Sequence, residues 1–266
     1  MIEKTYVNGR WGQVHLRLAG DPASLPLLLL HSTPKSGWLY EGMMHALAGQ
    51  FRLIAPDTPG YGASDPPPAP PSMFEHADAL LDIMATLADT GQISHAPLNA
   101  LGYHTGSSLS VAMAQRQPER IGRLVLVSIA AYDAATRAEK RANLANWPGP
   151  RPDGSHITYM WSLTKSLAHP DVTDDWLHTS VTENLRCGRR APWGYDAVYG
   201  HDLQAALAAL THKVLLLNPE DDLFDLTRAN RHLLPHARYV ELPGHGHGLF
   251  DLETDSLATL VREFLT

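Results

Sequence analysis

The sequence contains a single cysteine, Cys187, among its 266 residues. One thiol forms no internal disulfide and supplies no cysteine-based zinc site. We interpret Cys187 as a small residue inside a helical region rather than a catalytic thiol. Positive charge is also scarce, because 21 lysines and arginines stand against 28 aspartates and glutamates, a formal net charge of −7. A mildly acidic chain without a basic stripe predicts no nucleic-acid partner.

Long apolar runs are missing as well. Residues Met1–Tyr6 lack the apolar core of a signal peptide. The longest purely apolar run, Leu27–Leu30, is far too short to cross a bilayer. We therefore expect a cytoplasmic protein without a membrane partner, either a monomer or a homodimer. The hydrophobic share of 44% and the charged share of 18% are typical of a folded globular chain.

Short apolar runs bounded by turn residues alternate with stretches of helical spacing. The length and branching of the runs are typical of strands buried on both faces. The expected strands are Val14–Leu18, Leu27–Leu30, Leu53–Ala55, Leu98–Leu101, Leu124–Val127, Val214–Leu217 and Tyr239–Leu242. The expected helices are Leu39–Leu47, Phe74–Leu87, Leu109–Gln117, Leu226–Leu234 and Leu257–Phe264. The alternation predicts an α/β fold with a mostly parallel sheet flanked by helices, and a ligand site beyond the carboxyl ends of the strands.

The alternation breaks between Tyr132 and Gln204, in a stretch rich in tryptophan, tyrosine, histidine and proline. We interpret residues 132–204 as a helical cap, and residues 1–131 and 205–266 as the core domain. Most aromatic residues of the cap are expected to fill its own core. Two or three are expected to face a ligand, because a cap over an open sheet encloses a cavity.

The strongest local signal is Gly102-Tyr103-His104-Thr105-Gly106, which lies between an expected strand and an expected helix. It has the form of a nucleophile elbow, Gly-x-Ser-x-Gly, with histidine in place of serine. Glycines flank such a turn because larger side chains would collide with the neighbouring backbone. The middle residue is strained at a cost of roughly 1–3 kcal/mol, which indicates a functional use. The alternative is a glycine-rich turn with an incidental histidine.

Two other loops carry a wider resemblance. His31-Ser32-Thr33-Pro34 resembles the His-Gly-x-Pro loop of the α/β-hydrolase superfamily, and Asp57–Ser64 resembles its Asp-x-Pro-Gly-x-Gly-x-Ser loop. The resemblance implies an oxyanion hole made by the backbone N–H groups of Thr33 and Thr105. Asp57 is a catalytic acid in one interpretation, but we expect it instead to satisfy backbone donors in its own loop.

The resemblance extends to the last two expected strands, in the chain order elbow, acid, histidine. The turn after Val214–Leu217 makes Asp221 the catalytic acid, with Asp222 and then Asp225 as alternatives. The glycine-rich turn before the final helix makes His247 the catalytic histidine, with His245 as the second candidate. The implied fold is an α/β-hydrolase fold with a helical cap, covering Val14 to Phe264.

A histidine at the elbow leaves several mechanisms open. His104 is either a nucleophile that forms an acyl-imidazole, which water assisted by His247 and Asp221 then clears, or a substrate-binding group beside a His247–Asp221 general base. The second mechanism also suits a lyase or a cofactor-free oxygenase. A non-catalytic small-ligand receptor is the remaining reading. A protonated His247 nearby is expected to lower the pKa of His104.

The sequence therefore predicts a hydrolase that acts on a small, largely apolar ester or lactone. The catalytic set is His104, Asp221 and His247. The side chains expected to contact the substrate are His31, Tyr103, Trp161 and Trp193. No cofactor is expected. No metal is expected either, because Asp221 is taken to orient His247 from behind and a third ligand is not evident.

Overall fold

The computed structural model describes residues 1–266, and its eight strands form one sheet in the order β1-β2-β4-β3-β5-β6-β7-β8. β2 pairs antiparallel with β1 and with β4, and the other neighbouring pairs are parallel. The strands are β1 (Glu3–Gly9), β2 (Gly12–Ala19), β3 (Leu25–Leu30), β4 (Phe51–Pro56), β5 (Leu98–Tyr103), β6 (Ile121–Val127), β7 (Val214–Pro219) and β8 (Arg238–Leu242).

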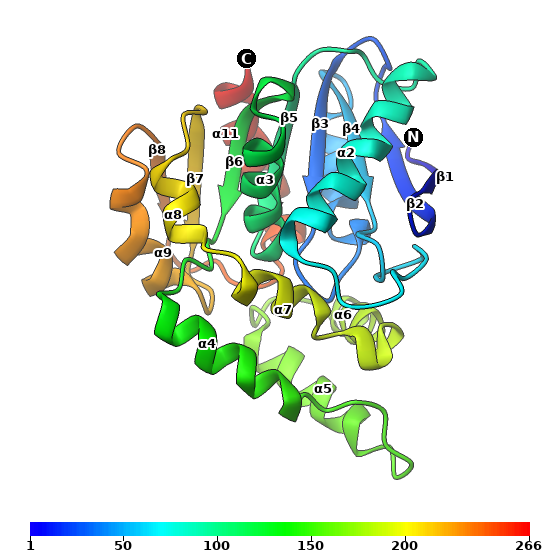
Figure 1. The fold of residues 1–266 in the computed structure, drawn as a ribbon, viewed down its shortest axis with the longest axis vertical. Helices are drawn as coiled ribbons and strands as arrows, with labels where there is room; N and C mark the ends of the chain where they lie inside the picture. Colours follow the sequence, from blue (N-terminus) through cyan, green and yellow to red (C-terminus); the bar gives the residue numbers. More distant parts are fainter.

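Helices cover both faces of the sheet (Figure 1). The α-helices are α1 (Glu41–Leu47), α2 (Met73–Asp89), α3 (Thr105–Arg116), α4 (Ala134–Asn143), α5 (Ser155–Leu167), α6 (Asp174–Arg186), α7 (Trp193–Gly200), α8 (Leu203–Ala208), α9 (Phe224–Asn230), α10 (Leu249–Leu252) and α11 (Thr254–Leu265). The 3-10 helices are η1 (Gly37–Tyr40), η2 (Pro118–Arg120), η3 (Leu144–Asn146), η4 (Gly188–Arg190) and η5 (Arg231–Leu233).

Two apolar clusters, one on each face, hold the layers together. In β3, Leu28 and Leu30 pack into the cluster that contains α2 and α3. Leu27 and Leu29 pack into the cluster that contains α1 and α11. Alternate residues of a strand point to opposite faces, so the leucine run Leu27–Leu30 serves both clusters. The predicted α/β fold with a mostly parallel, helix-flanked sheet is confirmed.

Helices α4–α8 are inserted between β6 and β7. Figure 1 shows α4, α5, α6 and α7 gathered beyond one end of the sheet. It is the end where β6 finishes, so the insertion lies over the carboxyl ends of the parallel strands. Residues of α8 already belong to the apolar cluster of the core. The division of the chain at residues 132 and 204 stays a prediction.

The structure adds one strand that the sequence pattern did not indicate. β1 is the edge strand, and its residues alternate between exposed and half-buried positions, so it has no continuous apolar run. At the start of α2, Ser72 and Glu75 form a reciprocal capping box. Among the helices, none combines the length and the apolar character that a membrane crossing requires.

Candidate active site

His104 lies at the turn between β5 and α3, where its backbone φ is +52°. The two glycines of the turn are sterically required. A Cβ on Gly102 would lie 2.2 Å from the carbonyl oxygen of Gly106, and a Cβ on Gly106 would lie 1.8 Å from the carbonyl oxygen of Leu30. A positive φ at a non-glycine residue costs of order 1–3 kcal/mol and persists only where the surroundings impose it. The expected elbow geometry is therefore present with histidine at its apex.

The buried acid of the site contacts the elbow directly. Nε2 of His104 lies 2.8 Å from Oδ2 of Asp221, whose side chain is fully buried just beyond β7. The same oxygen accepts hydrogen bonds from the hydroxyls of Ser128 at 2.6 Å and Tyr103 at 3.2 Å. The backbone N–H of Leu223 donates to Oδ1 at 2.9 Å. This pairing corrects the expectation that Asp221 orients His247, because the longer imidazole at the elbow reaches the acid first.

His247 is paired with the neighbouring acid instead. Its Nε2 lies 2.8 Å from Oδ1 of Asp222, and its Nδ1 lies 3.3 Å from the hydroxyl of Tyr103. The ring centroids of His104 and His247 are 5.3 Å apart. His245, the other histidine of this turn, faces Glu253 at 3.5 Å. The site therefore holds two adjacent histidine–carboxylate pairs.

The charges of the two acids set the electrostatics. Burial alone would lower the pKa of His104, but the negative charge and hydrogen bond of Asp221 outweigh it, so the pKa is raised above 6.5. This corrects the expected lowering by His247. Burial raises the pKa of Asp222, yet its hydrogen bond to His247 and the nearby positive charges bring it down to about 2. Both acids are thus anionic at neutral pH, and their negative charges make His104 more basic.

The two expected oxyanion donors flank the elbow. Thr33 follows β3, lines the pocket beside His104, and its carbonyl accepts a hydrogen bond from the Tyr195 hydroxyl at 2.8 Å. The backbone N–H of Thr33 makes no hydrogen bond within the protein. Thr105 is the first residue of α3, and the N–H of a first helical residue has no acceptor inside its helix. Neither amide therefore has a hydrogen-bond partner within the protein.

A pocket opens between the elbow and the inserted helices. Its lining residues are Ser32, Thr33, Pro34, Lys35, His104, Trp147, Met160, Leu163, Thr164, Leu167, Trp176, Ser180, Asn184, Tyr195, Asp222 and His247. The walls combine aromatic and aliphatic side chains from the inserted helices with the polar groups of the sheet edge. Such a mixture is typical of sites for small, largely apolar ligands.

The expected substrate contacts fall elsewhere. His31, Tyr103, Trp161 and Trp193 do not line the pocket. His31 is buried and fully engaged, since its Nδ1 donates to the carbonyl of Ser32 and its Nε2 accepts from the N–H of Thr58, both at 2.9 Å. Trp161 is 38% exposed on α5. Helical spacing alone does not say which face of α5 meets the core, so the aromatic content of the insertion did not identify its pocket residues.

The matches to known proteins agree with this architecture. A family model described as an alpha/beta hydrolase fold matches residues 26–152. A thermophilic esterase structure from Thermogutta terrifontis superposes with a TM-score of 0.80 at 20% identity, over 99% of this chain and 98% of that one. The enol-lactonase structure from Burkholderia xenovorans LB400 superposes with a TM-score of 0.77 at 20% identity, over 98% and 99%. The chain has the α/β-hydrolase fold.

Sequence relatives agree with that assignment. A pimeloyl-[acyl-carrier protein] methyl ester esterase from Nitrosomonas europaea is 24% identical over 259 residues, which cover 89% of this chain and 93% of the relative. An uncharacterized hydrolase from Saccharomyces cerevisiae, YNR064C, is 33% identical over 46% of this chain and 40% of its own length. The α/β-hydrolase fold thus accounts for the sheet order, the elbow and the position of the inserted helices.

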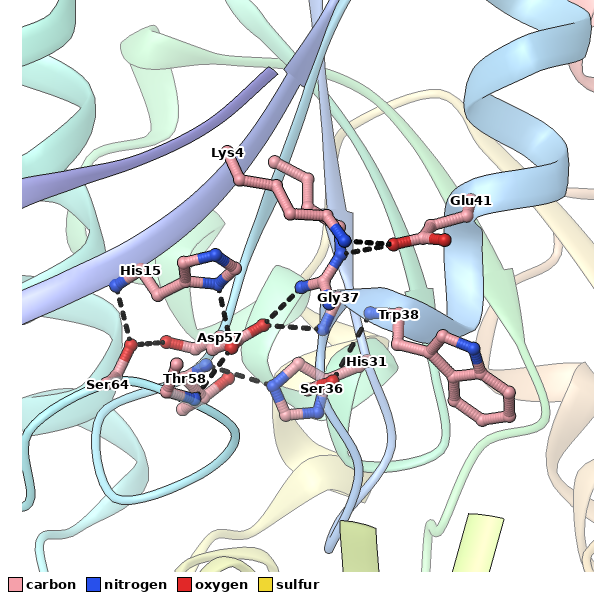
Figure 2. A network of polar contacts seen from close by, with 12 residues as sticks. Lys4, His15, His31, Ser36, Gly37, Trp38, Glu41, Asp57, Thr58 and Ser64 are labelled. Carbon is pink, nitrogen blue, oxygen red and sulfur yellow. Dashed lines mark hydrogen bonds and ion pairs between the residues drawn. The ribbon is translucent and has the colours of Figure 1, made fainter. Parts of the chain in front are cut away.

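A second polar cluster of this α/β-hydrolase fold is structural (Figure 2). The carboxylate of Asp57 accepts hydrogen bonds from the backbone N–H groups of Gly37 at 2.8 Å and Ala63 at 2.9 Å. It also contacts His15 at 2.9 Å and Arg17 at 3.0 Å. The prediction that Asp57 satisfies backbone donors is confirmed. Its network holds the β4 loop against the loop after β3, and so supports the loop that carries Thr33.

The sequence reasoning missed Lys35 in the loop after β3. Its ammonium donates to the carbonyl of Ser180 at 2.8 Å and to Oδ1 of Asn184 at 2.9 Å, both on α6. Burial lowers its pKa from 10.5 to about 7. The only available signal was a lysine two residues after Thr33 in an otherwise apolar or small-residue loop. Its partners lie about 145 positions away in the chain, so no local pattern pointed to them.

Proposed function

We propose that this protein is a cofactor-independent hydrolase of small, largely apolar esters or lactones, with His104 and Asp221 as its catalytic pair. The observation that carries the proposal is the 2.8 Å contact between the elbow imidazole, which lines the pocket, and the fully buried carboxylate of Asp221 behind it. An imidazole held in this way by a carboxylate is a general base. The esterase and enol-lactonase folds among the similar structures support the substrate class.

The hydrogen bond to Asp221 leaves the other ring nitrogen of His104 free to act. When Nε2–H donates to Asp221, Nδ1 carries the lone pair, and no protein group hydrogen-bonds to it. We propose that Nδ1 takes a proton from a water molecule as its oxygen attacks the substrate carbonyl. The negative oxygen that forms is bound by the N–H groups of Thr33 and Thr105. Asp221 stabilises the imidazolium, which then returns the proton to the leaving alkoxide.

His247 is proposed to act beside the leaving group. It lies next to His104, and the proton that its Nε2 shares with Asp222 is a second proton source for the alkoxide. Because Asp221 does not contact it directly, its removal should cost less than the removal of His104. The apolar walls from Trp147, Met160 and Leu163 are expected to hold the acyl or lactone chain.

The test is a comparison of His104→Ala, His247→Ala and wild type on a panel of p-nitrophenyl esters and small lactones. We expect His104→Ala to lower kcat/KM by ~10²–10⁴-fold, the range of a lost general base, and His247→Ala to lower it less. His245→Ala is the matched control and should behave as wild type. Equal activity of His104→Ala and wild type on every substrate that wild type turns over would overturn the proposal.

Two further measurements separate water attack from covalent attack. Rapid quench followed by mass spectrometry should find no acyl group on the peptide that contains His104; a transient acyl adduct there would make His104 a nucleophile instead. In His104→Ser, His247 paired with Asp222 is the base left to take the serine proton, so an acyl-serine should be detectable by the same mass spectrometry, whereas wild type should show no acyl adduct.

A further inference from the structure

We propose that His104, Asp222 and His247 form a binding site for a divalent transition-metal ion of the zinc class. One ring nitrogen of each histidine and one carboxylate oxygen of Asp222 all lie within 4.8 Å of one another. The three residues follow β5, β7 and β8, which lie in the same half of the sheet with β6 between β5 and β7. They line the pocket together. The proposal goes beyond the hydrolysis proposed above and is tested without it.

The donor set is the one that zinc prefers when it keeps an open position. Two imidazoles and one carboxylate are a ligand set of catalytic zinc sites, whose fourth position is left for water or substrate. Here that position would face the pocket, because all three side chains line it. Cysteine ligands are not required, and Cys187 lies elsewhere, at the end of α6.

Both histidines of the proposed site also hydrogen-bond to a second group that fixes the orientation of the ring. Metal-bound histidines usually hydrogen-bond through their second ring nitrogen to a carboxylate or another fixed group, which sets the ring orientation. His104 has Asp221 in this place, at 2.8 Å from Nε2. His247 has the hydroxyl of Tyr103, at 3.3 Å from Nδ1. The ligating atoms left over are Nδ1 of His104 and Nε2 of His247, so both outer contacts survive in the complex.

Closing the site requires only a small movement of exposed side chains. Tetrahedral ligands at ~2.0–2.1 Å from zinc are about 3.3–3.4 Å apart, so a pair separated by 4.8 Å has to draw in by about 1.5 Å. The side chains of His247 and Asp222 are 21% and 45% exposed, which leaves them room to turn. The 2.8 Å contact between them would widen by about half an ångström as the ion enters. The ion would take the place of the proton between Nε2 of His247 and Asp222, and the neutral ring would then carry its proton on Nδ1, which faces the Tyr103 hydroxyl.

The proposed ion competes with the proposed hydrolysis. Nδ1 of His104 has one lone pair, which either accepts a proton from water or binds the metal. Zinc is therefore expected to inhibit the metal-free hydrolase. Activation by zinc would instead overturn the metal-free mechanism while leaving the binding site in place, so the two proposals fail separately.

The test is calorimetric titration of EDTA-treated, dialysed protein with zinc chloride. We expect one ion per chain. Asp221→Asn and Tyr103→Phe should weaken binding by ~10–100-fold, as outer partners of metal ligands do. Loss of a ligand in Asp222→Asn or His247→Ala should weaken it further. Circular dichroism of each variant checks that the fold is retained.

Matched controls come from the same turns. His245→Ala removes the neighbouring histidine of the β8 turn, and Asp225→Asn removes an exposed acid three positions after Asp222. Both should bind zinc as wild type does. The proposal is overturned if wild type binds no zinc, or if His247→Ala and His245→Ala bind it equally well.

Discussion

An imidazole at position 104 extends farther from the backbone than a hydroxyl would, and its Nε2 reaches Asp221 at 2.8 Å. A serine oxygen is one bond from Cβ and is too short to reach the acid. An elbow serine therefore needs a histidine between them, which hydrogen-bonds to both the serine and the acid. His104 makes the contact itself, and His247 is left to pair with Asp222 at 2.8 Å. Because the His104 side chain is longer than serine, the site contains two separate pairs, His104–Asp221 and His247–Asp222, instead of a serine–histidine–acid triad.

The pH dependence of hydrolysis should report the charge of Asp221. The proposed base must be neutral, so kcat/KM is expected to rise with pH through the raised pKa of His104. In Asp221→Asn the attraction is gone while burial remains, so the pKa falls. The acidic limb of the profile should therefore move to lower pH, with a plateau ~10²–10⁴-fold below wild type.

The control for this profile is Asp222→Asn. Asp222 also raises the pKa of His104, but as the smallest of the contributions. The acidic limb of the Asp222→Asn profile should therefore also move to lower pH, but by less than the limb of Asp221→Asn. An acidic limb at the same pH in wild type and Asp221→Asn would contradict the assignment of His104 as the titrating base.

Whole elements were more predictable than their contacts. All seven expected strands are present, because strands buried on both faces read as apolar runs bounded by turns. β1 escaped because an edge strand needs no such run. The insertion was recognised by the break in alternation, but the faces of its helices were not. The sequence does not distinguish these four tryptophans of the insertion, but only Trp147 and Trp176 line the pocket, and Trp161 and Trp193 do not.

The Lys35 ammonium connects the loop after β3 to α6 through its hydrogen bonds to Ser180 and Asn184. Burial lowers its pKa from 10.5 to about 7, so the folded state binds the proton less well than the unfolded chain does. Such a group penalises folding below pH 7, and the penalty is relieved as pH rises from about 7 toward 10.5. We expect wild type to gain stability between pH 7 and pH 9 relative to Lys35→Met.

Urea unfolding of both proteins at pH 7, 8 and 9 measures this difference. Lys165→Met is the matched control, because Lys165 is exposed on α5, and its midpoint should follow wild type at each pH. Parallel curves for wild type and Lys35→Met across this range would show that the Lys35 amine is not desolvated in the folded protein.

Across the whole molecule, the sequence indicated which loops meet but not how their side chains pair. The resemblance placed Thr33, His104, Asp221 and His247 at one end of the sheet, because parallel strands bring their carboxyl ends together. The pairing of Asp221 with the elbow depends on how far each side chain reaches, which no spacing encodes. The confirmed role of Asp57 was easier to predict from the sequence, because an acid in a tight loop has backbone donors close to it in the chain.

The Asp57 network should also set the acid limit of the folded state. Burial raises the pKa of Asp57, but its contacts with His15, Ala63 and Arg17 bring the pKa down from 3.8 to about 2. Its stabilisation is therefore fully present above pH 3.8 and is lost as pH falls toward 2. Asp57→Asn removes one of the two acids that pair with Arg17, the other being Glu41, and should cost about 1–3 kcal/mol at neutral pH, measured by urea unfolding.

An exposed ion pair provides the comparison. Asp82 is 56% exposed and pairs with Arg10 at the surface, so Asp82→Asn should cost ~0–1 kcal/mol. The difference between wild type and Asp57→Asn should shrink as pH is lowered toward 2, whereas equal costs for the two substitutions at neutral pH would count against a structural role for Asp57.

The close approach of Gly106 to the carbonyl of Leu30 has a consequence for how this protein could change. The backbone of the elbow is pinned by contacts between main-chain atoms, and none of them involves the side chain at position 104. A hydroxyl, a thiol, a carboxylate or an imidazole can be carried there without disturbing the amides of Thr33 and Thr105. A substitution at this single position can therefore change the reactive group while the elbow backbone stays in place.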